Sequence, residues 1–366
     1  MAISRGLKSG NPLLLHGGDI RSASQQYGIP VDRWIDLSTG INPVPYPVGD
    51  LPLEAYHHLP YVQPELLERA SEYYRNGNLL PVPGSQSVIA LLPGCLPSAA
   101  VLVPEVGYQE HVNHWRQSGA DITSYPAFDT AESVAFIDAA LADNPRQHLV
   151  LINPNNPTGL CFAAEQLERW AERLVDGCYL IVDEAFVDTN AGGSVLVSHF
   201  QDNMIVLRSF GKFFGLAGIR LGFVFAHQRV LARLQAYLGA WSVNGPAQSV
   251  AIAALGNVAW QQQALREIEE SARLTREMFR PLLGEQAEWG ECVVTHQPLF
   301  STYRLVQERA QHLTQYLAER GILLRYLSLA GSDSDALVRI GILNRKNPLS
   351  VACVTEAVTE AIGAFG

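Results

Sequence analysis

A lysine follows directly after an apolar segment near the middle of the chain. Residues 204–209 are predicted to form a buried strand, and Lys212 comes three residues after it. Parallel sheets bind ligands beyond the carboxyl ends of their strands, so this lysine is well placed to meet one. A lysine amine is a nucleophile only when deprotonated, and a desolvated site with a second cation such as Arg220 would lower its pKa. The alternative is a solvated surface lysine.

Two other segments place polar side chains after apolar strands. Asp183 ends the strand predicted at 179–183, and a buried carboxylate is costly unless it is paired. A protonated ring nitrogen would be such a partner, and an Asp that caps the next turn is the alternative. Asn156 lies in the turn Asn-Pro-Asn-Asn-Pro-Thr-Gly, where its amide could donate to a phenolate oxygen. The neighbouring Glu184 is expected to be structural.

A fourth segment begins an apolar helix. Gly84, Ser85 and Gln86 could present free backbone N–H groups to an anion there, although many helices begin this way. No Gly-Lys-Ser/Thr follows, so the segment is not a P-loop, and the chain lacks the G-x-G-x-x-G pattern of nicotinamide-binding enzymes.

Short apolar strands alternate with helical segments through the first two thirds of the chain. This alternation predicts an α/β fold whose parallel sheet is covered on both faces. The helix predicted at 163–175 carries Leu167, Trp170 and Leu174 at amphipathic spacing. Prolines and glycines interrupt the uncharged segment 77–104, so we expect a loop, a buried helix and a strand there and no membrane span. The expected strands are 101–104, 148–153, 179–183, 204–209 and 221–226.

The pattern changes from about residue 247. A long polar helix near 260–283 is expected to connect two domains. Strands at 291–295, 300–304, 322–326 and 337–342, with a helix at 308–320, predict a smaller α+β domain. We expect a large domain at 45–255 and a small domain formed by 1–44 together with 256–366.

The bulk composition excludes some classes of partner. A formal net charge of −10 argues against broad binding to nucleic acid or anionic membranes. Five scattered cysteines without zinc-like spacing suggest reduced thiols in a cytoplasmic protein that binds no metal. Residues 1–12 lack the long apolar stretch of a secretion signal.

Taken in order, the four segments resemble the fold-type I enzymes that use pyridoxal phosphate (PLP), in the branch of the histidinol-phosphate aminotransferases. They read Gly-Ser-Gln, Asn-Pro-Asn-Asn-Pro-Thr-Gly, Asp-Glu-Ala-Phe and Ser-Phe-Gly-Lys-Phe-Phe-Gly-Leu-Ala-Gly-Ile-Arg-Leu-Gly. The resemblance covers nearly the whole chain. It implies a large domain with a mixed, mostly parallel sheet, a smaller α+β domain, and a homodimer with shared active sites.

The resemblance also implies roles for single residues. Lys212 would form the Schiff base, Asp183 would pair the pyridine nitrogen, and Asn156 would bind the ring 3-oxygen. Tyr108 would stack on the ring, with a core tyrosine as the alternative, and Tyr61 would reach the cofactor phosphate of the neighbouring subunit. The phosphate would otherwise be held by Ser209, Arg220 and the backbone of Gly84, Ser85 and Gln86.

The N-terminal segment resembles the L-threonine-O-3-phosphate decarboxylases of cobalamin biosynthesis. From His16 it reads His-Gly-Gly-Asp-Ile, and from residue 36 Asp-Leu-Ser-Thr-Gly-Ile-Asn-Pro, where that group has H-G-G-N and D-F-S-A-N-I-N-P. Asp19 and Gly40 depart from this pattern, and Gly40 could contact a substrate only through its backbone. Phe186 also matches the decarboxylase group, whereas aminotransferases of this branch usually carry Tyr; neutral drift is the alternative.

Two arginines are candidates for holding an anionic substrate. Arg325 and Arg339 each lie in an apolar stretch, where a guanidinium is costly without an anion. The planar guanidinium suits carboxylate and phosphate. By resemblance, Arg339 matches a carboxylate-binding arginine and Arg325 a position associated with the substrate phosphate; structural salt bridges are the alternative for both. His16 is a further candidate for the phosphate.

The sequence thus predicts PLP-dependent decarboxylation of L-threonine O-3-phosphate to (R)-1-aminopropan-2-yl phosphate. An aminotransferase that acts on histidinol phosphate or a related amino acid is the alternative. A PLP-binding regulator without catalytic activity is the other, but it would need a DNA-binding module, and we expect no room for one before His16.

Overall fold

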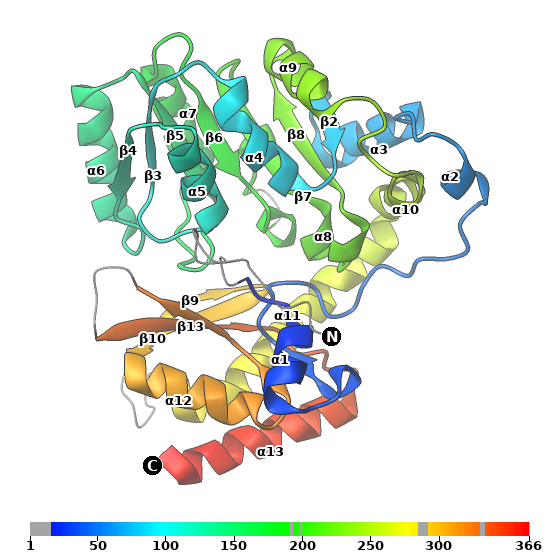
Figure 1. The fold of residues 1–366 in the computed structure, drawn as a ribbon, viewed down its shortest axis with the longest axis vertical. Coiled ribbons are helices and arrows are strands. Elements are labelled where there is room, and N and C mark those ends of the chain that lie inside the picture. Colours follow the sequence, from blue (N-terminus) through cyan, green and yellow to red (C-terminus); the bar gives the residue numbers. More distant parts are fainter. Residues whose placement is uncertain (1–15, 191–192, 198–199, 285–291, 330–333, 366) are drawn as a thin grey trace, which may run out of the picture.

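The computed structural model describes residues 16–190, 193–197, 200–284, 292–329 and 334–365, and Figure 1 shows its two domains one above the other. Residues 1–15 of the predicted small domain, and the start of the strand predicted at 291–295, lie outside the described residues.

The described residues of the upper domain form a seven-stranded sheet in the order β2-β8-β7-β6-β5-β3-β4. Strand β8 is antiparallel to β2 and β7, and the other neighbours are parallel, so the predicted mixed, mostly parallel sheet is confirmed. The strands are β2 (Leu79–Val82), β3 (Ala100–Pro104), β4 (Ile122–Tyr125), β5 (Gln147–Ile152), β6 (Leu180–Asp183), β7 (Met204–Ser209) and β8 (Gly222–Ala226).

The loop predicted at the start of 77–104 is instead strand β2. This prediction was wrong because Pro81 breaks the usual strand pattern. A proline is tolerated on an edge strand, where no neighbour needs its missing N–H, and β2 lies at the edge of the sheet.

Helices cover both faces of this sheet because its central strands are apolar on both faces. In β5, Leu149 and Leu151 face one core while Val150 faces the other. The first core is closed by α3 (Pro64–Tyr74), α6 (Thr130–Asp143), α7 (Ala164–Arg173) and α10 (Gly245–Gly256), and the second by α4 (Ser85–Cys95), α5 (Gln109–Gln117) and α9 (Gln228–Leu238). The domain also contains α2 (Glu54–His57) and α8 (Phe210–Phe213).

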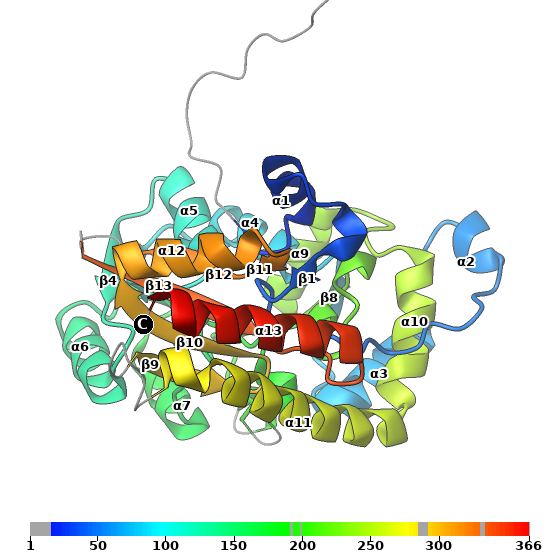
Figure 2. The ribbon, with the colours of Figure 1, turned by 90° about the horizontal axis from the view of Figure 1, so that it is seen from below.

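The lower domain has an antiparallel sheet in the order β12-β13-β10-β9. Figure 2, seen from below, shows α12, α13 and α11 lying side by side across that sheet. The segment predicted as one strand at 322–326 is divided, because β11 pairs with the N-terminal β1 while β12 joins β13. The elements are β1 (Ile35–Asp36), β9 (Val293–Gln297), β10 (Phe300–Val306), β11 (Ile322–Leu323), β12 (Arg325–Ser328), β13 (Asp335–Gly341), α1 (Ile20–Tyr27), α11 (Val258–Leu283), α12 (Gln307–Ala318) and α13 (Pro348–Phe365).

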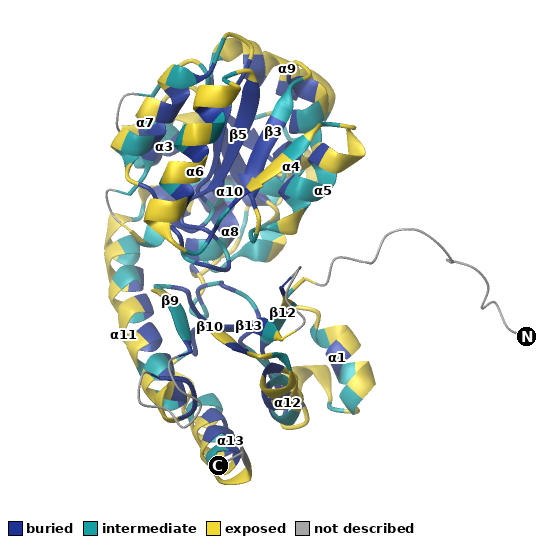
Figure 3. Cartoon of the chain, turned by 90° about the vertical axis from the view of Figure 1, so that its left-hand side faces the viewer, coloured by how far each residue is buried: buried dark blue, intermediate teal, exposed yellow. Residues whose placement is uncertain are grey.

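Helix α11 connects the two domains, as the sequence predicts. Figure 3 shows it running from the upper domain down to α13. Its first half buries Ala264 and Ile268 in the first core of the large domain, whereas Phe279 and Leu282 belong to the hydrophobic core of the small domain. The pairing of β1 with β11 ties the N-terminal segment to the C-terminal part. The predicted boundaries near 44 and 255 stay a prediction. Among the described helices, none is both long and apolar enough to span a membrane.

Candidate active site

A cavity of about 130 Å³ lies at the carboxyl ends of β5, β6 and β7, where the sheet geometry places ligands. Helix α8, which carries Lys212, lies at the edge of the large domain that faces the small domain (Figure 1). We call this the cofactor cavity, and its lining contains Gly84, Ser85, Gln86, Tyr108, Asn156, Asp183, Phe186, Ser209, Lys212 and Arg220. Every residue that the sequence assigns to the cofactor, except Tyr61, is therefore brought together within one chain.

The backbone of Lys212 is fixed by a hydrogen bond, whereas its side-chain amine is available to a ligand. Its carbonyl accepts a hydrogen bond from Asn42 N at 3.0 Å, which ties the N-terminal segment to α8. Within the described residues Nζ has no hydrogen-bond or ion-pair partner, and it lies 5.4 Å from the centre of the Phe186 ring. Burial lowers the pKa of Lys212 to about 8, helped first by Arg339 and less by Arg220, against the opposing effect of Asp183. Arg339 is thus a stronger influence than the Arg220 suggested by the sequence.

Asp183 is paired with a histidine that the sequence analysis missed. His111 Nε2 lies 3.0 Å from Asp183 Oδ2, and both side chains are almost completely buried. Because an ionised carboxylate only accepts hydrogen bonds, Nε2 is the protonated ring nitrogen. Asp183 Oδ1 accepts from Ala185 N at 3.1 Å. The carboxylate is therefore fixed in orientation at the cavity wall.

Asn156 joins the cofactor cavity to the small domain. Its Oδ1 accepts a hydrogen bond from Arg339 Nη1, so its amide group is the part left to donate. Arg339 Nη2 donates to the carbonyl of Ser38 at 2.6 Å, and its buried Nε has no partner within the described residues. The loop of the Asn-Pro motif, the N-terminal segment and strand β13 are therefore held together around one guanidinium.

The region predicted to bind the cofactor phosphate has room for its close backbone contacts only because positions 84 and 222 are glycines. Gly84 has a φ of 78° and precedes α4, and a Cβ on it would lie 2.7 Å from Arg220 Nη2. A Cβ on Gly222 would lie 2.7 Å from Ser85 N. The first N–H groups of a helix lack intrahelical acceptors, so this close approach sets free donors beside a guanidinium.

The residues of the cofactor cavity fit PLP. They provide a lysine amine that has no partner in the described part of the chain, a fixed carboxylate for a ring nitrogen, an amide donor on Asn156, and an anion cradle at Gly84 that a side chain would fill. Within the described residues, no group of three His, Cys, Asp or Glu is arranged to hold a metal ion.

A second cavity of about 260 Å³, which we call the substrate cavity, adjoins the first. The two share Tyr108, Asn156 and Lys212. The substrate cavity also brings together the four substrate candidates of the sequence analysis, which are His16, Gly40, Arg325 and Arg339.

Among the described residues, neither arginine of this cavity forms the salt bridge that was the structural alternative. Within that part of the chain no carboxylate lies within 4.0 Å of either guanidinium, and the side chain of Arg325 has no hydrogen-bond partner, although its backbone pairs with Arg339 in the sheet. Arg339 is 7% exposed. Burial and the neighbouring Arg325 lower the pKa of Arg339 to about 10, opposed by Asp36. Two adjacent cations without an anion are costly, so the cavity is built for an anionic ligand.

The departures at Gly40 and Asp19 have structural reasons. Gly40 is packed against two aromatic rings, and a Cβ there would lie 2.8 Å from Phe186 Cε1 and 3.3 Å from Phe300 Cδ1. An Asn at this position would displace Phe186. Asp19 caps α1 by accepting from Ser22 N at 3.0 Å, a role that Asn fills equally well.

Tyr61 lies away from both cavities. It is 71% exposed and contacts Trp241 edge-on, with 6.0 Å between ring centres. Its predicted role concerns a neighbouring subunit, so it stays a prediction.

A buried polar cluster of Glu184, Arg208 and Asp188 lies outside the two cavities. Glu184 is structural, as expected, because it is buried against Arg208, which also pairs with Asp188.

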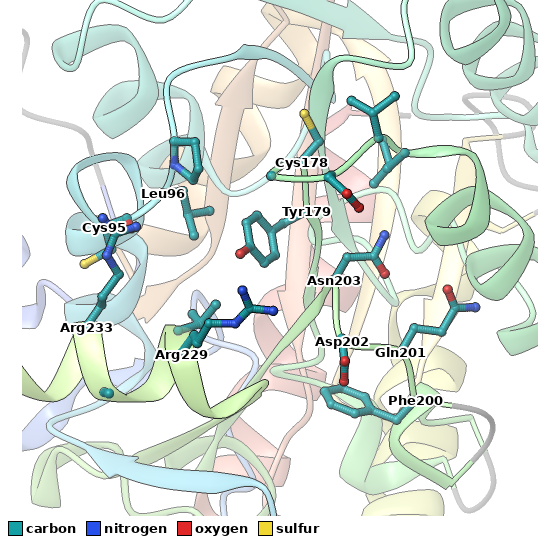
Figure 4. Close-up of a pocket in the computed structure, with 17 residues that line it drawn as sticks. Cys95, Leu96, Cys178, Tyr179, Phe200, Gln201, Asp202, Asn203, Arg229 and Arg233 are labelled. Carbon is teal, nitrogen blue, oxygen red and sulfur yellow. The ribbon is translucent and has the colours of Figure 1, made fainter.

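A wider cavity of about 1110 Å³, seen in Figure 4, lies at the amino ends of the strands and is lined by Cys95, Cys178 and exposed arginines. Parallel sheets bind ligands at the opposite end, so we do not assign the activity to it.

The comparisons with known proteins agree with this geometry. Residues 55–352 match the family Aminotransferase class I and II. Threonine-phosphate decarboxylase of Pseudomonas aeruginosa is 37% identical over 335 residues, which cover 90% of this chain and 93% of that protein. Threonine-phosphate decarboxylase of Sinorhizobium sp is 43% identical over 65% of this chain and 70% of that protein.

Solved structures share the fold. The histidinol-phosphate aminotransferase of Sinorhizobium meliloti, in complex with pyridoxal-5'-phosphate, has a TM-score of 0.75 at 20% identity and covers 100% of this chain and 99% of its own. The extent of the family match, together with the relative that is 37% identical along nearly its whole length, decides the assignment. The chain belongs to the aminotransferase class I and II family.

Proposed function

We propose that this protein is a PLP-dependent decarboxylase that converts L-threonine O-3-phosphate to (R)-1-aminopropan-2-yl phosphate and carbon dioxide. The observation that carries the proposal is the pair of arginines, Arg325 and Arg339, which share the substrate cavity with Lys212 and have no carboxylate within 4.0 Å among the described residues. A substrate with one carboxylate and one phosphate supplies both missing anions. The two threonine-phosphate decarboxylase relatives support this choice.

The cofactor would be held by residues of the large domain. Lys212 would bind PLP covalently through Nζ, Asp183 would face the ring nitrogen, and Arg220 with Ser209 and the start of α4 would hold the phosphate. When bound, PLP supplies an electron sink for the electron pair that carbon dioxide leaves behind. His111 keeps the Asp183 carboxylate oriented, because Nε2 donates to it at 3.0 Å.

The substrate would be oriented by its two charged ends. Arg339 would bind the carboxylate, and Arg325 with His16 the phosphate. Holding the carboxylate stabilises the ground state, and the reaction must lose that charge, so catalysis requires a geometry that favours bond breaking over binding. A carboxylate whose bond to Cα stands perpendicular to the cofactor ring meets that requirement.

Lys212 is suited to return a proton to Cα. The Cα–carboxylate bond breaks, carbon dioxide leaves, and one proton takes its place. A lysine whose pKa is about 8 both holds and releases a proton near neutral pH, and its amine is open to the two cavities.

One assay tests the reaction. Purified PLP-loaded protein is incubated with L-threonine O-3-phosphate, and carbon dioxide and aminopropanol phosphate are measured. We expect release with this substrate, and none with the Lys212→Ala variant. Amine transfer to 2-oxoglutarate without carbon dioxide release would instead establish the aminotransferase alternative.

The proposal includes a cytoplasmic homodimer with shared active sites. The segment around α2 projects from the large domain in Figure 1, and its side chains Leu53, Tyr56, Leu59 and Tyr61 are between 60% and 71% exposed. Contiguous exposed apolar residues mark interaction surfaces. The five cysteines are free thiols, which fits a reducing compartment.

Mixing two inactive chains tests the shared site. A Lys212→Ala chain keeps Tyr61, and a Tyr61→Ala chain keeps Lys212, so a mixed dimer contains one intact site only if Tyr61 acts across the interface. We expect activity to return on mixing, with a dimer mass by light scattering. A monomer, or no recovery in a verified mixed dimer, would contradict this part of the proposal.

A further inference from the structure

Glu110 is a partly buried carboxylate that contacts residues of both cavities and that neither the sequence motifs nor the proposed mechanism uses. It lies in the first turn of α5, and its side chain is 12% exposed. Its Oε2 accepts a hydrogen bond from Gln86 Nε2 at 2.7 Å and lies 3.2 Å from His114 Nε2. Its Oε1 lies 3.2 Å from His16 Nε2. One carboxylate thus contacts a wall residue of each cavity.

On the cofactor side, the charge of Glu110 sets the direction of a chain of hydrogen bonds. An ionised carboxylate only accepts, so the amide group of Gln86 must point its N–H toward Glu110. The Gln86 carbonyl then faces Tyr108, whose hydroxyl donates to it at 2.8 Å. Burial raises the pKa of Tyr108, followed by the effect of Glu110, so this hydroxyl stays protonated. The Tyr108 ring is therefore held in one orientation at the cofactor cavity.

On the substrate side, Glu110 holds the N-terminal segment. His16 is half exposed, and its ring lies 6.0 Å from that of Tyr108. The segment is anchored at its other end, because Gly18 N donates to Ser38 Oγ at 2.8 Å. Ser38 also accepts from Arg339 through its carbonyl. The contact between His16 and Glu110 therefore links the small-domain side of the substrate cavity to the large domain.

We propose that Glu110 is a positioning residue that couples the two cavities, since it fixes Tyr108 through Gln86 and holds His16 at the substrate cavity. The inference rests on the proposed function for the identity of the substrate. A purely structural role at the start of α5 is the competing explanation, because an acidic residue stabilises a helix N-terminus without any effect on ligands.

The test is the Glu110→Gln variant, which keeps the size of the side chain and removes its charge. A single carbonyl oxygen cannot accept from Gln86 and both histidines, so both links weaken. We expect the dissociation constant of PLP for the apo-protein, measured by tryptophan fluorescence, to rise about tenfold. We expect KM for L-threonine O-3-phosphate to rise about tenfold as well, with a smaller change in kcat.

Three further variants make the result specific. His114→Gln is the matched control, because His114 contacts the same carboxylate but lines neither cavity, and it should change neither quantity. Tyr108→Phe should reproduce the loss of PLP affinity, and His16→Gln should raise KM without changing PLP affinity. If Glu110→Gln does not fold, Glu110→Asp replaces it. This variant keeps the charge, but its shorter side chain cannot contact Gln86 and His16 at the same distances.

A change in only one of the two quantities, or in neither, overturns the coupling. Equal effects of His114→Gln and Glu110→Gln also overturn it, because they would reveal a structural role. The measurement of PLP affinity needs no substrate. Wild-type protein that releases no carbon dioxide therefore contradicts the proposed function, whereas unchanged PLP affinity in Glu110→Gln contradicts the role of Glu110.

Discussion

Replacing Lys212 by Met should stabilise the PLP-free protein at neutral pH. The amine lies among the cations Arg339 and Arg220 and has no hydrogen-bond partner within the described residues. A protonated lysine in such a site destabilises the fold, and methionine fills similar space without a charge. The expected gain is therefore a direct measure of what the active-site environment costs the folded state.

The size of the effect follows from the pKa of Lys212. The pKa falls from 10.5 in an open chain to about 8 in the folded protein. At ~1.36 kcal/mol for each pH unit, the charged lysine costs the folded state about 3 kcal/mol. Between pH 8 and 10.5 this lysine binds more protons in the unfolded chain than in the folded one, so the contribution of Lys212 to wild-type stability rises with pH in that window. The cost is fully present below pH 8 and disappears above 10.5.

The assay is urea unfolding of both apo-proteins from pH 7 to pH 10.5. The chain contains three lysines, so few other amines titrate in this range. We expect Lys212→Met to be more stable by about 3 kcal/mol at neutral pH, with the difference shrinking as pH rises. Lys346→Met is the control, because it removes a surface lysine that pairs with Glu267 at 2.8 Å. A difference that does not depend on pH would refute the argument, since a mere gain in apolar packing has no such dependence.

Three other predictions follow from single contacts. His111→Leu leaves Asp183 without its buried donor and should cost about 2 kcal/mol of unfolding free energy; the loss should be smaller with PLP bound, and equal losses would argue against a ring-nitrogen role. Arg325→Met should raise KM for L-threonine O-3-phosphate about tenfold or more in steady-state assays while leaving unphosphorylated L-threonine unaffected; an equal effect on both would exclude phosphate binding. Arg208→Met leaves the buried carboxylates of Glu184 and Asp188 without their cation. The free energy of unfolding, measured by chemical unfolding, should fall by about 3–5 kcal/mol, and a much smaller loss would show that these three residues are not ion-paired.

The strands and the cofactor cavity could be predicted because their signals are local. Each short apolar segment predicts a strand without reference to the rest of the chain, and each motif lies at or just after the end of one strand. Because neighbouring parallel strands end at the same edge of the sheet, Lys212, Asp183 and Asn156 come together at that edge. Strand β2 was missed because Pro81 is compatible with a strand only at a sheet edge, and edge position is not visible in the sequence. The division of 322–326 was missed for a similar reason, since the partner of β11 is the distant β1.

His111 and Glu110 were missed because their partners lie far along the chain. His111 is 72 residues from Asp183, and Glu110 is 94 residues from His16. A helical position facing a cavity is indistinguishable from a surface position until the fold is known. One signal was available, because both residues lie within one turn of Tyr108, which the resemblance had already placed at the cofactor.

Arg339 connects substrate binding to the acid–base state of Lys212. It is a candidate for the substrate carboxylate, and it is also the cation that most lowers the pKa of Lys212 after burial. An anion bound at Arg339 offsets that positive charge, so the pKa of the lysine must rise when the cavity is filled. A lysine whose pKa rises as substrate enters is more fully protonated near neutral pH in the occupied site, so it holds the proton that the proposed mechanism returns to Cα. The arginines therefore do more than select an anionic substrate, because their charge, once neutralised by it, changes the reactivity of the amine beside them.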